Sequence, residues 1–234
     1  MSSNPANSSN SRSVDMRKVT VLLVDLDETV YPSSSAVWPL VRERLDIYLR
    51  DRLGFDPLII PELRERLFNT YGTTLRGLQV EYSVDTDDYL AYVHNLPLRD
   101  YIQPDPQLRS ILLELPQPRW IFTNADAEHA YRVLDILGVS DCFVGVIDVR
   151  SVHPAGKPAP EAMWKALERA GSPDPNACVL LDDSPANIAG AQQLGLTTVL
   201  VGNGTHPHTA SYQVTNLVDL PVAHPEFWRG LVGR

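Results

Sequence analysis

Short apolar runs alternate with segments of helical spacing along most of this chain. The first run, residues 19–24, is rich in β-branched residues, too short for a typical helix and apolar on both faces. It is therefore predicted to be a buried parallel strand. Four later runs are also predicted to be strands. The predicted strands lie near 19–24, 119–124, 143–148, 177–182 and 197–201.

Helices are predicted between these strands. Segments 129–137, 160–170 and 185–194 are each followed closely by a glycine that can end a helix, and Pro160 is well placed to open one. Strands separated by helices imply a parallel sheet with right-handed crossovers. The pattern therefore indicates the α/β fold class.

The stretch from residue 33 to about 103 interrupts this alternation. It is far longer than a normal crossover connection, so it must hold structure of its own. Segments 37–53, 61–71 and 85–93 have helical apolar spacing. Their apolar and aromatic residues are interpreted as the core of a small helical bundle, because such stripes usually mean burial.

The two ends of the chain are less regular. The first 16 residues are rich in Ser and Asn with few apolar groups, and are predicted to form a disordered tail. After Gly202 the chain contains three prolines, at positions 207, 221 and 225. This segment is predicted to run over the surface, with one short strand near Gln213–Val214.

Composition narrows the class of protein. The chain has 234 residues, enough for one α/β domain with an inserted subdomain. A net charge of −9 argues against binding to a nucleic-acid polymer, although it does not exclude a nucleotide in a local pocket. Cys142 and Cys178 lack metal-type spacing and fit a reducing compartment. Because the sequence has neither a membrane-length apolar run nor an apolar signal core, a cytoplasmic location is predicted.

Polar side chains follow three of the predicted strands, and a lysine precedes a helix between two of them. This set comprises Asp25, Asp27, Thr123, Asn124, Lys157, Asp182 and Asp183. Carboxylates crowded at strand ends repel one another unless a cation relieves them. Ligand sites in α/β folds lie outside the carboxyl ends of the strands. The set therefore indicates a magnesium and phosphate site.

Each member of the set also has an ordinary structural explanation. Asp25 and Asp27 could form an Asx-type turn, and Lys157 could be a solvated loop lysine. Thr123-Asn124 could cap a helix, and Asp182-Asp183 could be favourable acids at a helix N-terminus. None of these explanations accounts for all the segments ending strands of one predicted sheet.

These residues resemble the motifs of the haloacid dehalogenase-like (HAD) hydrolase superfamily. The matching segments are Asp25-x-Asp27-x-Thr29, Thr123-Asn124, Lys157-Pro158 and Asp182-Asp183-Ser184-Pro185-Ala186-Asn187-Ile188. Within the superfamily, the chain is most similar to the pyrimidine 5′-nucleotidase group. That similarity rests on residues 25–32, 71–78, 93–98 and 122–130. Glu28 departs from the group, where Asn is frequent, and is expected to point away from the metal.

The resemblance implies a three-layer Rossmannoid parallel sheet with a small α-helical cap inserted after the first strand. It covers roughly residues 18–203. Residues 17–32 and 104–234 would form the discontinuous core, 33–103 the cap, and 1–16 the tail. A cap over the strand ends excludes water and selects the substrate.

The resemblance also implies roles at the strand ends. Asp25 would attack phosphorus and become an aspartyl phosphate. Asp27 would protonate the leaving alkoxide and later help deprotonate water, and its pKa is expected to be raised by a crowded pocket. Mg²⁺ would be held by Asp25, by the main-chain carbonyl of Asp27 and by Asp183. The sequence does not separate Asp182 as a direct ligand from Asp182 as a support for the ligands.

Phosphate binding is implied for three further residues. Thr123 and the amide of Asn124 would hold phosphoryl oxygens, and Lys157 would balance the charge of the phosphate and of Asp25. Asn187 is expected to support the metal site. Lone histidines are usually satisfied surface or core groups, and magnesium prefers oxygen, so His94, His129 and His153 are not expected to be ligands.

The implied function is hydrolysis of nucleoside 5′-monophosphates, with a preference for pyrimidines. Arg76 is a candidate specificity residue, since a guanidinium binds carbonyl oxygens and stacks on bases, although it could equally be a paired surface arginine. Alternatives are a phosphatase or mutase for another small ester, such as a sugar phosphate or lysophospholipid. Non-enzyme alternatives are a receiver-like or a silent phosphate-binding domain. A dehalogenase is disfavoured, because it has no alkoxide for Asp27 to protonate.

Overall fold

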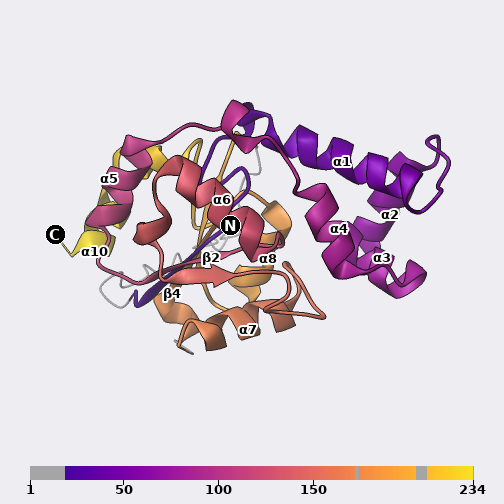
Figure 1. The fold of residues 1–234 in the computed structure, drawn as a ribbon. Helices are drawn as coiled ribbons and strands as arrows, with labels where there is room; N and C mark the ends of the chain where they lie inside the picture. The colour runs from indigo at the N-terminus through magenta and orange to yellow at the C-terminus, as the bar shows by residue number, and fades with distance from the viewer. Residues whose placement is uncertain (1–18, 172–173, 204–209, 234) are drawn as a thin grey trace, which may run out of the picture.

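A six-stranded parallel sheet forms the centre of the molecule (Figure 1). The computed structural model describes residues 19–171, 174–203 and 210–233, so the predicted tail at 1–16 lies outside the described residues. The strand order is β3-β2-β1-β4-β5-β6. The strands are β1 (Val21–Val24), β2 (Arg119–Phe122), β3 (Gly145–Ile147), β4 (Cys178–Asp182), β5 (Thr197–Val201) and β6 (Tyr212–Val214).

Alternate residues of β1 face opposite sides of the sheet. Leu22 and Val24 pack into one apolar cluster, whereas Val21 and Leu23 pack into another. Neither face of the strand meets solvent, because each packs into one of these clusters, and both edges are paired, with β2 and with β4. Two buried faces explain why this sequence reads as continuously apolar.

Helices cover both faces of the sheet and give three layers. Figure 1 shows α7 on one side of the sheet and α6 on the other. The helices of the core are α5 (Pro106–Glu114), α6 (Ala127–Leu137), α7 (Pro160–Arg169), α8 (Pro185–Gln193), α9 (Leu220–Ala223) and α10 (Pro225–Val232). Short 3₁₀ turns lie at Ser33–Ser35, Leu98–Asp100, Ser140–Cys142, Pro175–Ala177 and Leu217–Asp219. The α/β class and the three-layer arrangement predicted from the sequence are confirmed.

Four of the helices between β1 and β2 lie beside the sheet (Figure 1). They are α1 (Val37–Asp51), α2 (Ile60–Tyr71), α3 (Thr74–Tyr82) and α4 (Thr86–Val93). The Thr73 hydroxyl accepts from the Arg76 main-chain N–H at 3.0 Å, which caps α3. The ring of Tyr48 on α1 meets that of Tyr89 on α4 edge to face, with centroids 5.3 Å apart. We call these four helices the cap; the boundary of a separate cap domain at 33–103 stays a prediction.

The C-terminal segment is more regular than the sequence predicted. The short strand is confirmed as β6. The expectation of an irregular surface segment is wrong, because α10 buries Phe227, Trp228 and Leu231 in the larger apolar cluster. Pro225 occupies the first turn of α10, where a missing N–H is not needed. Among the described residues, no helix is long and apolar enough to span a membrane.

Candidate active site

The carboxyl ends of β1, β2 and β4 bring three polar residues together. Asp25 directly follows β1, Thr123 directly follows β2, and Asp182 is the last residue of β4. The main-chain N–H of Asp25 donates to Leu181 O at 2.8 Å, so the pairing of β1 with β4 continues to the site. Because these strands are neighbours and parallel, their polar ends meet at one edge of the sheet.

Lys157 joins two of the carboxylates. Its Nζ lies 2.5 Å from Asp25 Oδ1 and 2.7 Å from Asp182 Oδ2. The lysine side chain is 1% exposed, so the cation is almost fully removed from water. Burial alone would lower the Lys157 pKa, but Asp182 and Asp25 outweigh it, and the pKa is raised. Lys157 is therefore a permanent cation between two acids.

The Asp182 carboxylate accepts hydrogen bonds from three protein groups. Besides Lys157, it accepts from the Ser184 main-chain N–H and from Asn187 Nδ2, each at 2.9 Å. Ser184 and Asn187 belong to the first turn of α8, whose N-terminus favours negative charge. This bonding favours Asp182 as a residue that anchors Lys157 over Asp182 as a direct metal ligand.

Asp183 differs from Asp182 in its environment. It is half-buried, and no cation of the described chain forms an ion pair with it. Burial raises its pKa to about 7, with further increases from Asp182 and Glu28 and a smaller opposing effect of Lys157. One ligand atom from each of Asp25, Asp182 and Asp183 lies within 4.8 Å of the others. This oxygen-only donor set fits Mg²⁺.

Asp27 faces a histidine that the sequence did not connect with the site. Asp27 Oδ1 lies 3.0 Å from His129 Nε2 and accepts from the Tyr31 hydroxyl at 2.6 Å. Burial raises the Asp27 pKa, but the electrostatic effect and hydrogen bond of His129 and the hydrogen bond of Tyr31 outweigh burial, so the pKa is lowered overall. The expectation of a raised Asp27 pKa is therefore wrong, because burial was the only influence visible in the sequence.

Thr123 and Asn124 differ in which of their hydrogen-bonding groups remain available to a ligand. The Thr123 hydroxyl accepts from Ala125 N at 3.0 Å and keeps its own proton available to donate. The Asn124 side chain is committed to the Lys157 backbone, accepting from its N–H at 2.8 Å and donating to its carbonyl at 3.0 Å. Asn124 therefore fixes the loop that carries Lys157. Among the described residues, none accepts a hydrogen bond from the Asn124 main-chain N–H.

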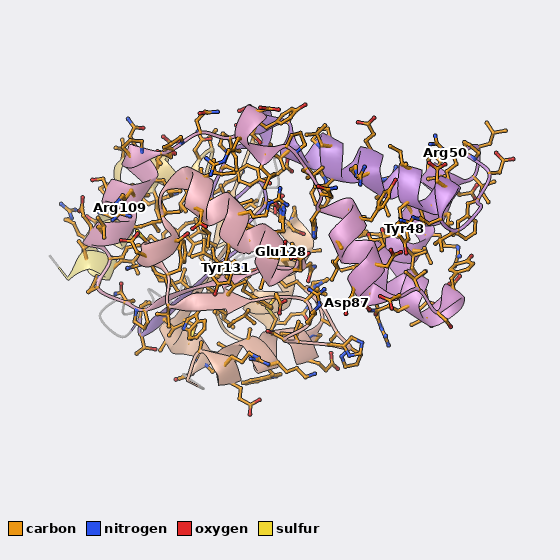
Figure 2. All side chains as sticks on the ribbon, in the orientation of Figure 1. Tyr48, Arg50, Asp87, Arg109, Glu128 and Tyr131 are labelled. Carbon is orange, nitrogen blue, oxygen red and sulfur yellow. The ribbon has the colours of Figure 1, made fainter. Side chains whose placement is uncertain are left out.

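A cavity of about 300 Å³ lies between the cap and the core. Its lining includes Thr73, Arg76, Gln79, Asp87, Arg150 and Gly156. Asp87 lies at the boundary between cap and core (Figure 2) and pairs with Arg150 at 2.7 Å. A Cβ atom at Gly156 would lie 3.0 Å from Asn124 Oδ1 and 3.6 Å from Thr73 Cγ2. The cavity therefore adjoins the loop that carries Lys157.

Arg76 is a free cation in this cavity. It is half-buried on α3, and its guanidinium forms no hydrogen bond or ion pair with any residue in the described ranges. Gln79, one turn later, donates its Nε2 to the Thr86 hydroxyl at 2.8 Å and keeps its carbonyl oxygen as an acceptor. The interpretation of Arg76 as a paired surface arginine is therefore not supported.

Replacing Lys157 with methionine is expected to lower the free energy of unfolding by about 3–5 kcal/mol, because two buried carboxylates lose their cation. The loss should shrink towards acidic pH, where the carboxyl groups take up protons. Chemical denaturation of the metal-free protein measures it. Lys165→Met is the matched control, since among the described residues Lys165 Nζ donates hydrogen bonds only to main-chain carbonyls, including Val152 O at 3.2 Å. Equal stability losses in the two variants would contradict a supporting role of the ion pairs.

Comparisons with known proteins agree with this geometry. A family model described as haloacid dehalogenase-like hydrolase matches residues 19–195. Over 196 residues, the chain is 30% identical to Phosphate metabolism protein 8 of Saccharomyces cerevisiae, covering 77% of this chain and 60% of that protein. The chain thus spans less than two thirds of that relative's length. It is also 25% identical over 226 residues to a Glyceraldehyde 3-phosphate phosphatase of Pyrococcus furiosus, covering 88% of this chain and 92% of that one.

Solved structures show the same fold. A β-phosphoglucomutase from Clostridium difficile superposes with a TM-score of 0.62 at 19% identity, covering 92% of this chain and 100% of that chain. An L-2-haloacid dehalogenase from Xanthobacter autotrophicus superposes with a TM-score of 0.57 at 17% identity, covering 87% of this chain and 97% of that chain. At this level of identity, the likeness extends to the fold alone.

Proposed function

The chain belongs to the haloacid dehalogenase-like hydrolases, and on this premise we propose that it is a Mg²⁺-dependent phosphomonoesterase that prefers pyrimidine nucleoside 5′-monophosphates. One observation carries the proposal. Lys157 bridges Asp25 and Asp182, while Asp183 stands beside them without an ion-pair partner among the described residues. A buried cation next to a carboxylate and an oxygen-only metal cluster suits an anionic phosphate ester.

The proposed reaction divides hydrolysis into two transfers. An Asp25 oxygen attacks phosphorus as the ester bond breaks, and Asp27 gives a proton to the departing alcohol oxygen. Water then attacks the aspartyl phosphate, Asp27 takes the water's proton, and Asp25 is released with inorganic phosphate. Thr123, the main-chain N–H of Asn124 and Lys157 hold the phosphoryl oxygens.

The metal would sit among Asp25, the Asp27 main-chain carbonyl and Asp183, with Asp182 holding Lys157 in place. Bound Mg²⁺ would offset the negative charge of the phosphate as a Lewis acid. The bonding of Asp182 to three protein donors supports this division between the two neighbouring acids.

Three groups of alternative functions compete with this proposal. A mutase or a phosphatase for another small ester would need only a different cap contact, and relatives carry phosphatase and mutase names. A dehalogenase is disfavoured by Asp27, which would have no alkoxide to protonate. A silent or receiver-like phosphate-binding domain is disfavoured by the presence of every proposed reactive group. A small-molecule substrate is favoured over a nucleic-acid polymer by the net charge of −9. The buried free cysteines fit the reducing environment of the cytoplasm.

The cavity supports a substrate with a polar, planar leaving group. It adjoins the Lys157 loop, and it holds the unpaired Arg76 guanidinium and the Gln79 carbonyl oxygen. Arg76 can donate to a base carbonyl and stack on a base, and Gln79 can accept from an N–H group. A pyrimidine offers both kinds of partner in a small ring.

We expect UMP and CMP to be hydrolysed with a higher kcat/KM than AMP, GMP, glycerol phosphate or sugar phosphates. Arg76→Ala should lower kcat/KM for UMP by about 10- to 100-fold, since hydrogen bonds to charged groups contribute about 1.5–3 kcal/mol. Hydrolysis of p-nitrophenyl phosphate, which carries no base, should change by less than about threefold. Phosphate release across this panel is the measurement.

Arg66→Ala is the matched control. Arg66 is a cap arginine that pairs with Glu81 at 2.6 Å and does not line the cavity. Pyrimidine monophosphates that are no better than sugar phosphates would contradict the substrate class and leave the phosphatase proposal standing. Transfer of phosphate between sugar positions without release would instead support the mutase.

A further inference from the structure

Two hydrogen bonds meet on one oxygen of the Asp27 carboxyl group. Oδ1 accepts from the Tyr31 hydroxyl at 2.6 Å and lies 3.0 Å from His129 Nε2. No side chain or main-chain group of the described residues donates to Oδ2. The side chain is 14% exposed, so a ligand in the site can still reach the carboxyl group. The Asp27 carboxyl group is thus fixed through Oδ1, and Oδ2 remains available to a ligand.

The His129 ring is itself held on two sides. Its side chain is fully buried on the first turn of α6, and it stacks on the His94 ring with centroids 4.4 Å apart and an interplanar angle of 20°. His94 Nδ1 lies 2.6 Å from Asp126 Oδ2. Asp126 also caps α6, because its Oδ1 accepts from His129 N at 2.8 Å. The ring therefore has little freedom to turn away from Asp27.

The hydrogen bonding also fixes which ring nitrogen carries the proton. His129 Nδ1 is buried without a hydrogen-bond partner in the described part of the chain. A proton on that nitrogen would lack an acceptor, whereas a proton on Nε2 points at Asp27 Oδ1. His129 is therefore assigned as a donor to Asp27, in the same sense as Tyr31.

We propose that His129, together with Tyr31, is a positioning residue that orients the Asp27 carboxyl group for proton transfer to the leaving alcohol. This inference rests on the phosphatase function proposed above. Proton transfer needs the acid within hydrogen-bonding reach of the leaving oxygen, and an aspartate side chain free to rotate presents either oxygen in many directions. Two donors on Oδ1 select one orientation, in which Oδ2 carries the proton to the alkoxide oxygen as the ester bond breaks.

The test uses the leaving group as a probe of acid catalysis. An alkyl alcohol needs a proton to depart, whereas p-nitrophenolate departs without one. His129→Leu should lower kcat/KM for UMP or an alkyl phosphate by about 10- to 100-fold and that for p-nitrophenyl phosphate by less than about threefold. The ratio kcat/KM excludes the later hydrolysis of the aspartyl phosphate. His129→Gln, whose amide N–H can replace Nε2–H, should recover part of the loss.

Tyr31→Phe removes only a hydroxyl and keeps the ring in the core, so it tests the same oxygen without a risk to folding. It should show a smaller loss with the same dependence on the leaving group. Tyr131→Phe, on the outer side of α6 (Figure 2), is the matched control and should leave both ratios unchanged.

Equal losses on both kinds of ester in His129→Leu and Tyr31→Phe, or no loss on either, would overturn the positioning role and leave the phosphatase function standing. A wild-type protein that hydrolyses neither ester would remove the proposed function and this inference with it.

Discussion

Asp25→Asn is expected to lower kcat by at least about 10³-fold while the protein stays folded. The side chain follows β1, is buried, and lies 2.5 Å from the Lys157 ammonium, which places it where an attacking oxygen is needed. An amide of the same shape cannot attack phosphorus. Lys157 keeps its second partner, Asp182, so the cation is not left unpaired. Steady-state turnover and circular dichroism together measure the two parts of this expectation.

Asp100→Asn serves as the control, since Asp100 is exposed on a 3₁₀ turn outside the site. Its turnover should match that of the parent protein. An Asp25→Asn protein that retains turnover within about tenfold of the parent would show that another group is the nucleophile, because removal of a covalent nucleophile costs far more than tenfold.

Removal of Mg²⁺ should abolish activity, and Mg²⁺ should restore it better than Zn²⁺, because the available ligands are oxygens. Among substitutions of the proposed ligands, Asp183→Ala should weaken the response of activity to Mg²⁺ most. A second readout needs no turnover: Mg²⁺ should raise the thermal midpoint of the parent protein by binding only its folded state, and this shift should vanish in Asp183→Ala.

The affinity for Mg²⁺ should also depend on pH. The pKa of Asp183 is raised to about 7 by burial and by its acidic neighbours. Metal binding needs the carboxylate form of Asp183, so below that pH the carboxyl group must lose a proton before Mg²⁺ binds. The affinity should therefore fall on acidification below about pH 7 and level off above it. Full activity in chelator, or zinc that stays with the protein through purification, would contradict the magnesium site.

The central strands β1, β4 and β5 could be predicted from the sequence because all their residues are buried, on both faces of the sheet. A continuous apolar run such as Val21–Val24 has few other interpretations. Helix α3 was not predicted, because it is short and contains Gly77, which reads as a helix breaker. The structure gives the reason for that glycine: a Cβ there would lie 2.8 Å from Leu67 Cβ on α2. Close packing of two helices, which a single sequence does not reveal, sets this position.

Part of the candidate site could likewise be predicted from the sequence, and part could not. Asp25 and Asp182 could be grouped in advance, because neighbouring parallel strands end at one edge of the sheet. Lys157, on the loop before α7, could be added to them only through its match to the family motif. His129 could not be linked to Asp27, since 102 positions separate them and lone histidines carry little information. A signal did exist: His129 lies in the first turn of the helix after β2, and such a turn starts beside the strand ends. Which face of that turn meets Asp27 depends on tertiary packing.

The placement of the four cap helices between β1 and β2 has an evolutionary consequence. Asp25 and Asp27 precede the cap, and Lys157 and Asp183 follow it, so the cap residues contribute none of the proposed reactive groups. Mutation can therefore reshape the cavity around Arg76 while the chemistry at the strand ends stays untouched. A lineage built this way can change its substrate in small steps without passing through an inactive ancestor. The phosphatase, mutase and dehalogenase names carried by proteins of similar sequence or fold are the diversity that such an arrangement permits.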